Sequence, residues 1–155
     1  MAHLTLSILG SFEATLDGRP VERLNSAHLR ALLAYLAVAK EREHPREQVA
    51  ALLWPERSDR EALDALRYAL SHLHRALHDR RAACPFLLVS HTHLQFNPAC
   101  DHWLDLAEFQ ELSNRSDGPS LERAVALYRG PFLDGLSIAD SPAFEELIQP
   151  IGLFV

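Results

Sequence analysis

The chain has 155 residues, 48% hydrophobic and 23% charged, which is typical of one globular domain, or of one small domain and part of another. It contains no apolar run of the roughly 18 residues that a membrane span requires, no secretory signal pattern at its N-terminus, and only two cysteines, too few for a disulfide scaffold. Membrane-embedded and disulfide-rich classes are therefore excluded, and we expect a cytoplasmic protein with no membrane partner.

The net charge of −6 is distributed unevenly along the chain. Residues 1–97 contain 12 Lys and Arg against 11 Asp and Glu, a net charge of +1, together with eight of the nine histidines. Residues 98–155 contain 3 Arg against 10 Asp and Glu, a net charge of −7. This asymmetry predicts two modules with different partners. The first module is weakly charged for a nucleic-acid-binding protein, which counts against that class.

The N-terminal residues predict a small antiparallel sheet. Leu4–Ile8 and Phe12–Leu16 alternate apolar and polar residues, as half-buried strands do. The dipeptide Asp17-Gly18 that follows is a strong hairpin signal, because both of its positions must accept positive φ. Arg19–Glu22 is then predicted to be a short third strand.

Two helices are predicted next. Ala27–Ala39 contains strong helix formers and is apolar on nearly every side, so we expect a mostly buried helix capped by Asn25 or Ser26. After a charged connection, Arg46–Trp54 is predicted to be a short second helix, which Pro55 ends.

The third predicted helix, Arg60–His78, is the most amphipathic segment, and Ser58 or Asp59 is expected to cap it. Its apolar side is a stripe of leucines spaced three or four residues apart: Leu63, Leu66, Leu70, Leu73 and Leu77. The opposite side and its flanks carry mostly long donors and histidines: Arg60, Asp64, Arg67, Tyr68, Ser71, His72, His74, Arg75 and His78. This helix is predicted to be anchored in the core and to present its polar side to a polyanion, although an ordinary solvated face has the same pattern.

Two apolar, strand-like runs follow, Phe86–Ser90 and Leu94–Phe96, and they predict a hairpin with His91, Thr92 and His93 at its tip. Three further helices are expected in the acidic part of the chain. The first ends at about Leu112, the second is Leu121–Tyr128 with Ser120 as its cap, and the third runs from Pro142 to about Gln149. Trp54 is expected to be a core residue that closes the turn before the third helix.

The order of sheet, three helices and hairpin is that of a winged helix-turn-helix domain, in which the third helix enters the DNA major groove and the hairpin lies along the adjacent backbone. We therefore predict an α+β fold: a winged helix-turn-helix with an N-terminal antiparallel sheet and a C-terminal hairpin wing, followed by a short all-α segment. The recognition helix is placed at residues 60–78 and the wing at residues 86–96. The domains are placed at residues 1–98 and 99–155.

Five stretches occur in order between Leu4 and about Phe144: LSILGSFEATLDGRPV, LRALLAYLAV, HPREQVAALLWPE, ALDALRYALSHLHRAL and YRGPFLDGL. Together they resemble bacterial activators of the antibiotic regulatory protein (SARP) type. The resemblance implies a response-regulator-like winged-helix domain followed by a helical, TPR-like bacterial transcriptional activator domain, which is truncated here. It also implies sequence-specific binding to promoter DNA, often at direct repeats, contact with RNA polymerase, and a cytoplasmic, nucleoid-associated location.

This sequence departs from the family pattern in its recognition helix. The family usually has Arg at the position of Leu63, and Arg-Arg at the positions of His74 and Arg75. Both changes remove positive charge from the helix, so we expect modest affinity per monomer. The sequence also lacks the GxxxxGK[ST] phosphate loop that the larger relatives carry in an ATPase module.

The candidate DNA-binding residues come from the recognition helix, from the start of the second helix and from the wing. The arginines are candidates for phosphates or guanine edges, and the hydroxyl and imidazole groups for hydrogen bonds to bases or phosphates. The full set is Arg46, Arg60, Arg67, Tyr68, Ser71, His72, His74, Arg75, His91, Thr92 and His93. Asp64 on the same face is expected to pair with Arg60 or Arg67, or to accept from a cytosine amino group. Arg80 and Arg81 are further candidates for the DNA backbone.

Other classes have weaker support. No catalytic motif is present, so we predict no enzyme activity and no cofactor. A zinc site is conceivable from two cysteines and three histidines, but they lack paired C-x2-C spacing, and we predict no metal; the residues are Cys84, His91, His93, Cys100 and His102. The alternative function is a winged-helix interaction or dimerisation module with weak or lost DNA binding, in which the acidic helices and the apolar IGLFV tail form a homodimer or partner surface.

Overall fold

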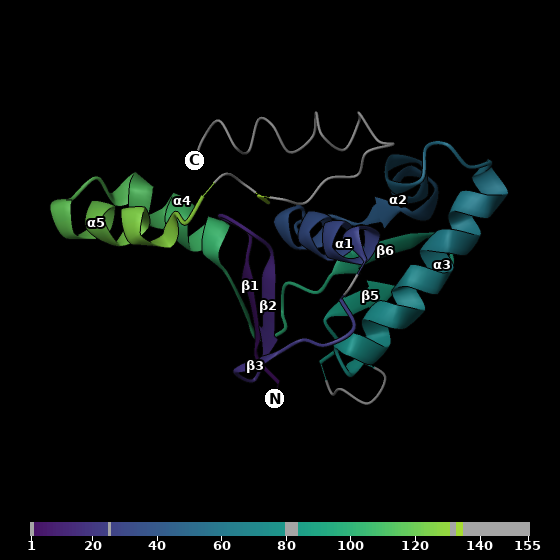
Figure 1. The fold of residues 1–155 in the computed structure, drawn as a ribbon, viewed down its shortest axis with the longest axis horizontal. Coiled ribbons are helices and arrows are strands. Elements are labelled where there is room, and N and C mark those ends of the chain that lie inside the picture. Colours follow the sequence, from purple (N-terminus) through teal and green to yellow (C-terminus); the bar gives the residue numbers. More distant parts are fainter. Residues whose placement is uncertain (1, 25, 80–83, 131–132, 135–155) are drawn as a thin grey trace.

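The computed structural model describes residues 2–24, 26–79, 84–130 and 133–134. Within these ranges the chain is a mixed α/β protein with five helices and two small sheets. Figure 1 shows the N-terminal sheet in the middle, with helices α1, α2 and α3 on one side and α4 and α5 on the other. The predicted helix Pro142–Gln149 and the IGLFV tail lie outside the described residues.

The N-terminal sheet has four strands in the order β3-β2-β1-β7. β1 (Leu4–Ser7) and β2 (Glu13–Leu16) pair antiparallel, and Asp17 and Gly18 make the predicted left-handed turn with φ of 52° and 81°. β3 is shorter than predicted, Arg19–Pro20, although the Val21 amide still donates to the Ala14 carbonyl of β2 at 2.9 Å.

The fourth strand of this sheet, β7 (His102–Leu104), was not predicted. It pairs parallel to β1, so the sheet is mixed rather than purely antiparallel. Three residues are too few to show alternation, and the partner strand is almost one hundred residues away in the sequence. A strand from beyond residue 98 thus completes the N-terminal sheet, while the division at 98/99 into two domains stays a prediction.

The first three helices are close to their predicted bounds: α1 is Ala27–Val38, α2 is Arg46–Leu53 and α3 is Asp59–Ala76. Serine caps two of them. The Ser26 side chain accepts from the His28 amide at 3.2 Å, and the Ser58 side chain accepts from the Glu61 amide at 3.2 Å. Of the paired alternatives, serine is therefore the cap in both helices.

The apolar side of α3 packs into a core that continues through α1, the N-terminal sheet and the two hairpin phenylalanines. Four of the five predicted leucines are fully buried: Leu66, Leu70, Leu73 and Leu77. The fifth, Leu63, is only half-buried and borders an open hollow between α2 and α3. Trp54 is buried as predicted, and its ring stacks on His28 at a centroid distance of 5.0 Å.

The predicted hairpin is present as β5 (Leu87–Val89) and β6 (His93–Phe96). A two-residue strand β4 (His44–Pro45) pairs with β6 and completes a second sheet in the order β4-β6-β5. The sequence predicted only a charged connection at His44. That residue is buried, and its Nε2 lies 2.8 Å from the Ala39 carbonyl oxygen.

The acidic part of the chain forms α4 (Asp105–Arg115) and α5 (Gly118–Leu127), which pack on each other. The predicted cap of α5 is wrong: Asp117, not Ser120, is the cap, and its carboxylate accepts from the Ser120 amide and hydroxyl at 2.8 and 2.9 Å. These two hydrogen bonds lower the pKa of Asp117. None of the helices in the described ranges is both long and apolar enough to cross a membrane.

Candidate nucleic-acid interface

The exposed side of α3 presents a row of polar side chains at helical spacing. Arg60, Arg67 and Arg75 are exposed, and Ser71 lies between the last two. The predicted pairing of Asp64 is with Arg67, whose Nη2 is 3.2 Å from the Asp64 Oδ1. An ion pair this exposed contributes little free energy, so Arg67 can leave Asp64 and bind a ligand with little loss of stability. The Arg75 Nη2 donates to the Ser71 Oγ at 3.5 Å, which directs that guanidinium along the same face.

Tyr68 and His72 lie on one flank of this face. Their rings meet edge-on at 4.5 Å, and Tyr68 is 68% exposed, an unusual degree for an aromatic side chain. Both line a hollow of about 770 Å³ between α3, the start of α1 and the turn at Trp54. The structure therefore keeps these two candidates accessible to a partner.

His74 occupies a different position from the other candidates on α3. Its side chain is 23% exposed, and its Nδ1 lies 3.3 Å from the Oδ2 of Asp79, whose side chain is almost fully buried. The two Asp79 oxygens also accept from the Phe86 and Leu87 amides, at 2.7 and 3.0 Å. His74 is thus part of the junction between α3 and the hairpin.

Asp79 is a residue of this surface that the sequence did not indicate. It accepts hydrogen bonds from the start of the hairpin and contacts α3 through His74, so it links the two elements that the winged-helix prediction places on DNA. An isolated aspartate after a helix resembles a surface residue in the sequence. Its burial and its contacts show that it joins α3 to the hairpin.

At the hairpin tip, His91 and Thr92 are exposed, whereas His93 is the first residue of β6 and half-buried. The placement of His93 at the tip is therefore wrong, because it pairs with Pro45 of β4. Its Nδ1 lies 2.8 Å from the Thr92 Oγ1. The Ser90 Oγ, another group that the sequence did not indicate, accepts from the His93 amide at 3.0 Å and closes the turn.

The hairpin tip is also tied to α2. The amide of Arg46, the first residue of that helix, donates to the Thr92 carbonyl at 2.9 Å. The Arg46 Nε is buried without a hydrogen-bond partner in the described part of the chain. Of the other cations predicted nearby, Arg80 and Arg81 lie outside the described residues. The tip, α2 and α3 are therefore held as one unit.

The cysteines and histidines of the zinc hypothesis are engaged in ordinary contacts. The Cys100 thiol donates to the Asn97 carbonyl at 2.9 Å, and the His102 Nδ1 lies 2.8 Å from the Cys100 carbonyl oxygen. The Cys84 Sγ accepts from the Asn97 amide group at 3.5 Å. Among the residues that the structure describes, no three His, Cys, Asp or Glu side chains are grouped so as to hold a metal ion.

The two thiols are expected to differ in reactivity. Burial raises the pKa of Cys100 to about 12, so its thiol stays protonated near neutral pH, whereas Cys84 is partly exposed. Iodoacetamide at pH 8 should alkylate Cys84 first, with Cys100 reacting only after unfolding in urea. Mass spectrometry of the digested chain measures both modifications, and equal rates in the native protein would contradict this placement.

The comparison with solved structures identifies a relative in fold. The structure is similar to that of Mycobacterium tuberculosis EmbR in complex with a low-affinity phosphopeptide, with a TM-score of 0.74 and 23% sequence identity. This chain shares the fold of the matched part of EmbR. The match covers 99% of this chain and 44% of the EmbR chain, so the chain spans less than half the length of that relative. No family model and no curated protein matches the sequence.

Proposed function

We propose that this chain is a sequence-specific DNA-binding transcription regulator of the SARP type, with a winged helix-turn-helix formed by α1, α2, α3 and the β5–β6 hairpin. The observation that carries the proposal is the joint placement of α3 and the hairpin. A core-anchored helix presents an exposed arginine row, and Asp79 and the bond from Arg46 to Thr92 hold the hairpin beside it. Similarity in fold to EmbR and the five sequence stretches described above support the same class.

In this proposal α3 enters the major groove, whose width of about 12 Å accepts an α-helix. Arg60, Arg67 and Arg75 then face base edges or phosphates, and Tyr68, Ser71 and His72 add donors and an aromatic ring. His91 and Thr92 contact the neighbouring backbone from the exposed tip of the hairpin. His74 acts indirectly, by bracing Asp79 at the junction with the hairpin.

The proposal also assigns two partners. The first is double-stranded promoter DNA, and the second is RNA polymerase, which a regulator of this type contacts. Leu63 and His74 stand where the family it resembles usually has arginine, and the chain carries a net charge of −6. Repeated sites or a partner protein therefore have to supplement the affinity of one copy.

The proposal is tested by selecting bound sites from random double-stranded DNA and measuring affinity for the selected site at increasing KCl concentration. The dissociation constant should rise steeply with salt, because every phosphate that the protein neutralises releases a counterion. A recurring motif among the selected sites establishes sequence specificity. Failure to retain any DNA at low salt would eliminate the proposal.

Arg67→Ala is expected to weaken binding to the selected site by about 5- to 150-fold, the equivalent of the roughly 1–3 kcal/mol carried by a good base contact. Arg115→Ala is the matched control, since Arg115 on α4 also forms an exposed ion pair, with Glu111 at 2.9 Å. Fluorescence anisotropy with a labelled duplex measures both variants. Equal affinities would remove α3 from the interface.

The alternative function is an interaction or dimerisation module with weak DNA binding. The observation that favours it is the exposed Tyr68 on the edge of the hollow shared by α1 and α3. Multi-angle light scattering of the full chain tests it: a dimer that Tyr68→Ser dissociates favours this function. A monomer that binds the selected DNA favours the first.

A further inference from the structure

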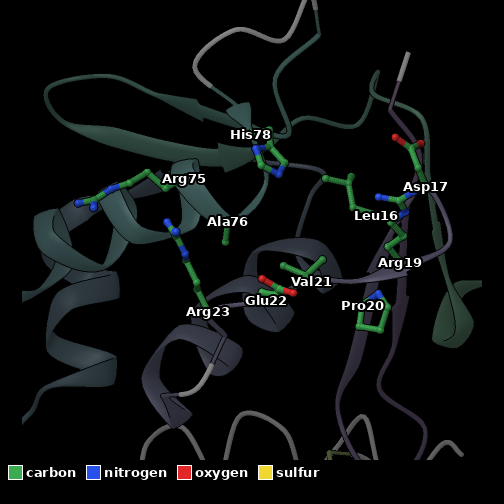
Figure 2. Close-up of a pocket in the computed structure, with 10 residues that line it drawn as sticks. All are labelled: Leu16, Asp17, Arg19, Pro20, Val21, Glu22, Arg23, Arg75, Ala76 and His78. Carbon is green, nitrogen blue, oxygen red and sulfur yellow. The ribbon is translucent and has the colours of Figure 1, made fainter.

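A second hollow, of about 590 Å³, lies between the C-terminal end of α3 and the segment that follows β2. Four of its lining residues carry basic side chains: Arg19 and Arg23 from that segment, and Arg75 and His78 from the end of α3. Figure 2 shows Arg23 extending from its segment toward α3, on which Arg75 lies. The hollow therefore gathers cations from two parts of the chain that are about fifty residues apart.

The hollow is cationic although two carboxylates line it. Three arginines face Asp17 and Glu22, which leaves a net charge of +1 with His78 neutral, in a chain whose total is −6. One Asp17 oxygen already accepts from the His3 amide at 2.8 Å. Asp17 and Glu22 both oppose an anion in this hollow, and Glu22 lies next to Arg23 in the chain.

The arginines of the N-terminal segment are available to a ligand. Within the described ranges, neither the Arg19 nor the Arg23 guanidinium has a hydrogen bond or ion pair, and both residues are exposed. Arg23 and His78 adopt left-handed backbone conformations, with φ of 70° and 55°. Such conformations are unfavourable for residues other than glycine, and they set the direction in which these two side chains leave the backbone.

The hollow lies on the flank of α3 that faces away from the hairpin. Successive residues of a helix point about 100° apart, so His74 and Ala76 point in nearly opposite directions. His74 points to Asp79 and the hairpin, whereas Ala76 lines the hollow. A helix in the major groove has one phosphate backbone on each flank, because its diameter of about 10–12 Å fills the groove. If the hairpin meets one backbone, the other backbone runs past this hollow.

We infer that this hollow is a second phosphate-binding site, in which Arg19 and Arg23 join Arg75 to hold backbone phosphates of the DNA strand opposite the hairpin. Guanidinium groups suit this role because their forked donors match two phosphate oxygens. The N-terminal sheet thereby becomes part of the DNA interface. The inference rests on the proposed function and extends it to a surface that the sequence did not indicate.

The test is the salt dependence of DNA binding by the full chain carrying Arg19→Gln and Arg23→Gln. With the selected duplex as probe, the slope of log affinity against log salt should fall in magnitude by about 0.9 for each lost phosphate contact, and so by about 1.8 for the double variant. The preferred DNA sequence should not change, because phosphate contacts carry no base information. Glu22→Gln removes the opposing charge and should raise the affinity.

Arg123→Gln is the control, because it removes one exposed arginine from α5, away from this hollow. Circular dichroism verifies the fold of each variant; all three changed residues of the hollow are exposed, so no core contact is lost. The inference is overturned if the double variant keeps the wild-type salt slope, or if Glu22→Gln weakens binding. Those results leave the proposed function intact, whereas a wild-type chain that binds no DNA refutes both.

Discussion

Replacing Asp79 with alanine is expected to lower the free energy of unfolding by about 3–6 kcal/mol, since two hydrogen bonds to a charged acceptor are worth about 1.5–3 kcal/mol each. The substitution leaves the Phe86 and Leu87 amides, both at buried residues, without their acceptor. It also removes the carboxylate that faces His74. Urea denaturation followed by circular dichroism measures the loss.

Asp64→Ala is the matched control for Asp79→Ala. Asp64 lies on α3, shortly before Asp79 in the chain, but its ion pair with Arg67 is exposed, so its loss should cost less than about 1 kcal/mol. Asp79→Asn keeps one acceptor oxygen and should fall between the two. If Asp79→Ala is as stable as Asp64→Ala, the carboxylate does not hold the hairpin. In a chain that remains folded at low temperature, Asp79→Ala should also weaken DNA binding, because the hairpin loses its fixed position beside α3.

The second large effect is expected for Asp105→Ala, with a loss of about 3–6 kcal/mol on the same basis. The buried carboxylate of Asp105 accepts from the Ile8 amide at 2.9 Å and, through its other oxygen, from the Leu9 amide at 2.9 Å. Alanine leaves both amides without an acceptor in the core. Because these bonds join the start of α4 to the two residues that follow β1, the variant should unfold the N-terminal sheet together with the acidic helices.

Asp101→Ala provides the comparison for Asp105→Ala. Asp101 stands four residues earlier and pairs with His3 at 2.9 Å, but both side chains are about half exposed. Its replacement should cost less than about 1 kcal/mol. Two separate urea transitions in Asp105→Ala, one for each part of the chain, would show that the acidic helices fold independently of the sheet.

These two aspartates show the limit of inference from the sequence. Each accepts backbone amide hydrogens from a distant or separate element, and such a partner leaves no local pattern. The same holds for the short strands β4 and β7, whose partners are found far along the chain. Arg19 and Arg23 likewise resemble an ordinary charged turn in the sequence, and only the fold places them in one hollow with Arg75.

Within the predicted interface, some side-chain contacts were predictable from helical spacing and others were not. Helical spacing offered Arg60 and Arg67 as ion-pair partners of Asp64, because neighbouring turns of a helix bring such residues together, and the structure shows the pair with Arg67. His74 and His93 were less predictable. His74 contacts the buried carboxylate of Asp79, which lies beyond the end of α3. His93 belongs to β6, because β4 pairs with it there.

Elements with local signals were predictable from the sequence: the leucine stripe of α3, the turn at Asp17-Gly18 and the hairpin strands. These depend on the 3.6-residue and two-residue periods and on backbone preferences of single residues. Tertiary contacts set which acids are buried, how the hairpin is fixed to α3, and that Arg19 and Arg23 line a hollow at the end of α3. These features depend on hydrogen bonds and charges between residues far apart in the sequence, and a local periodicity carries no information about such pairs.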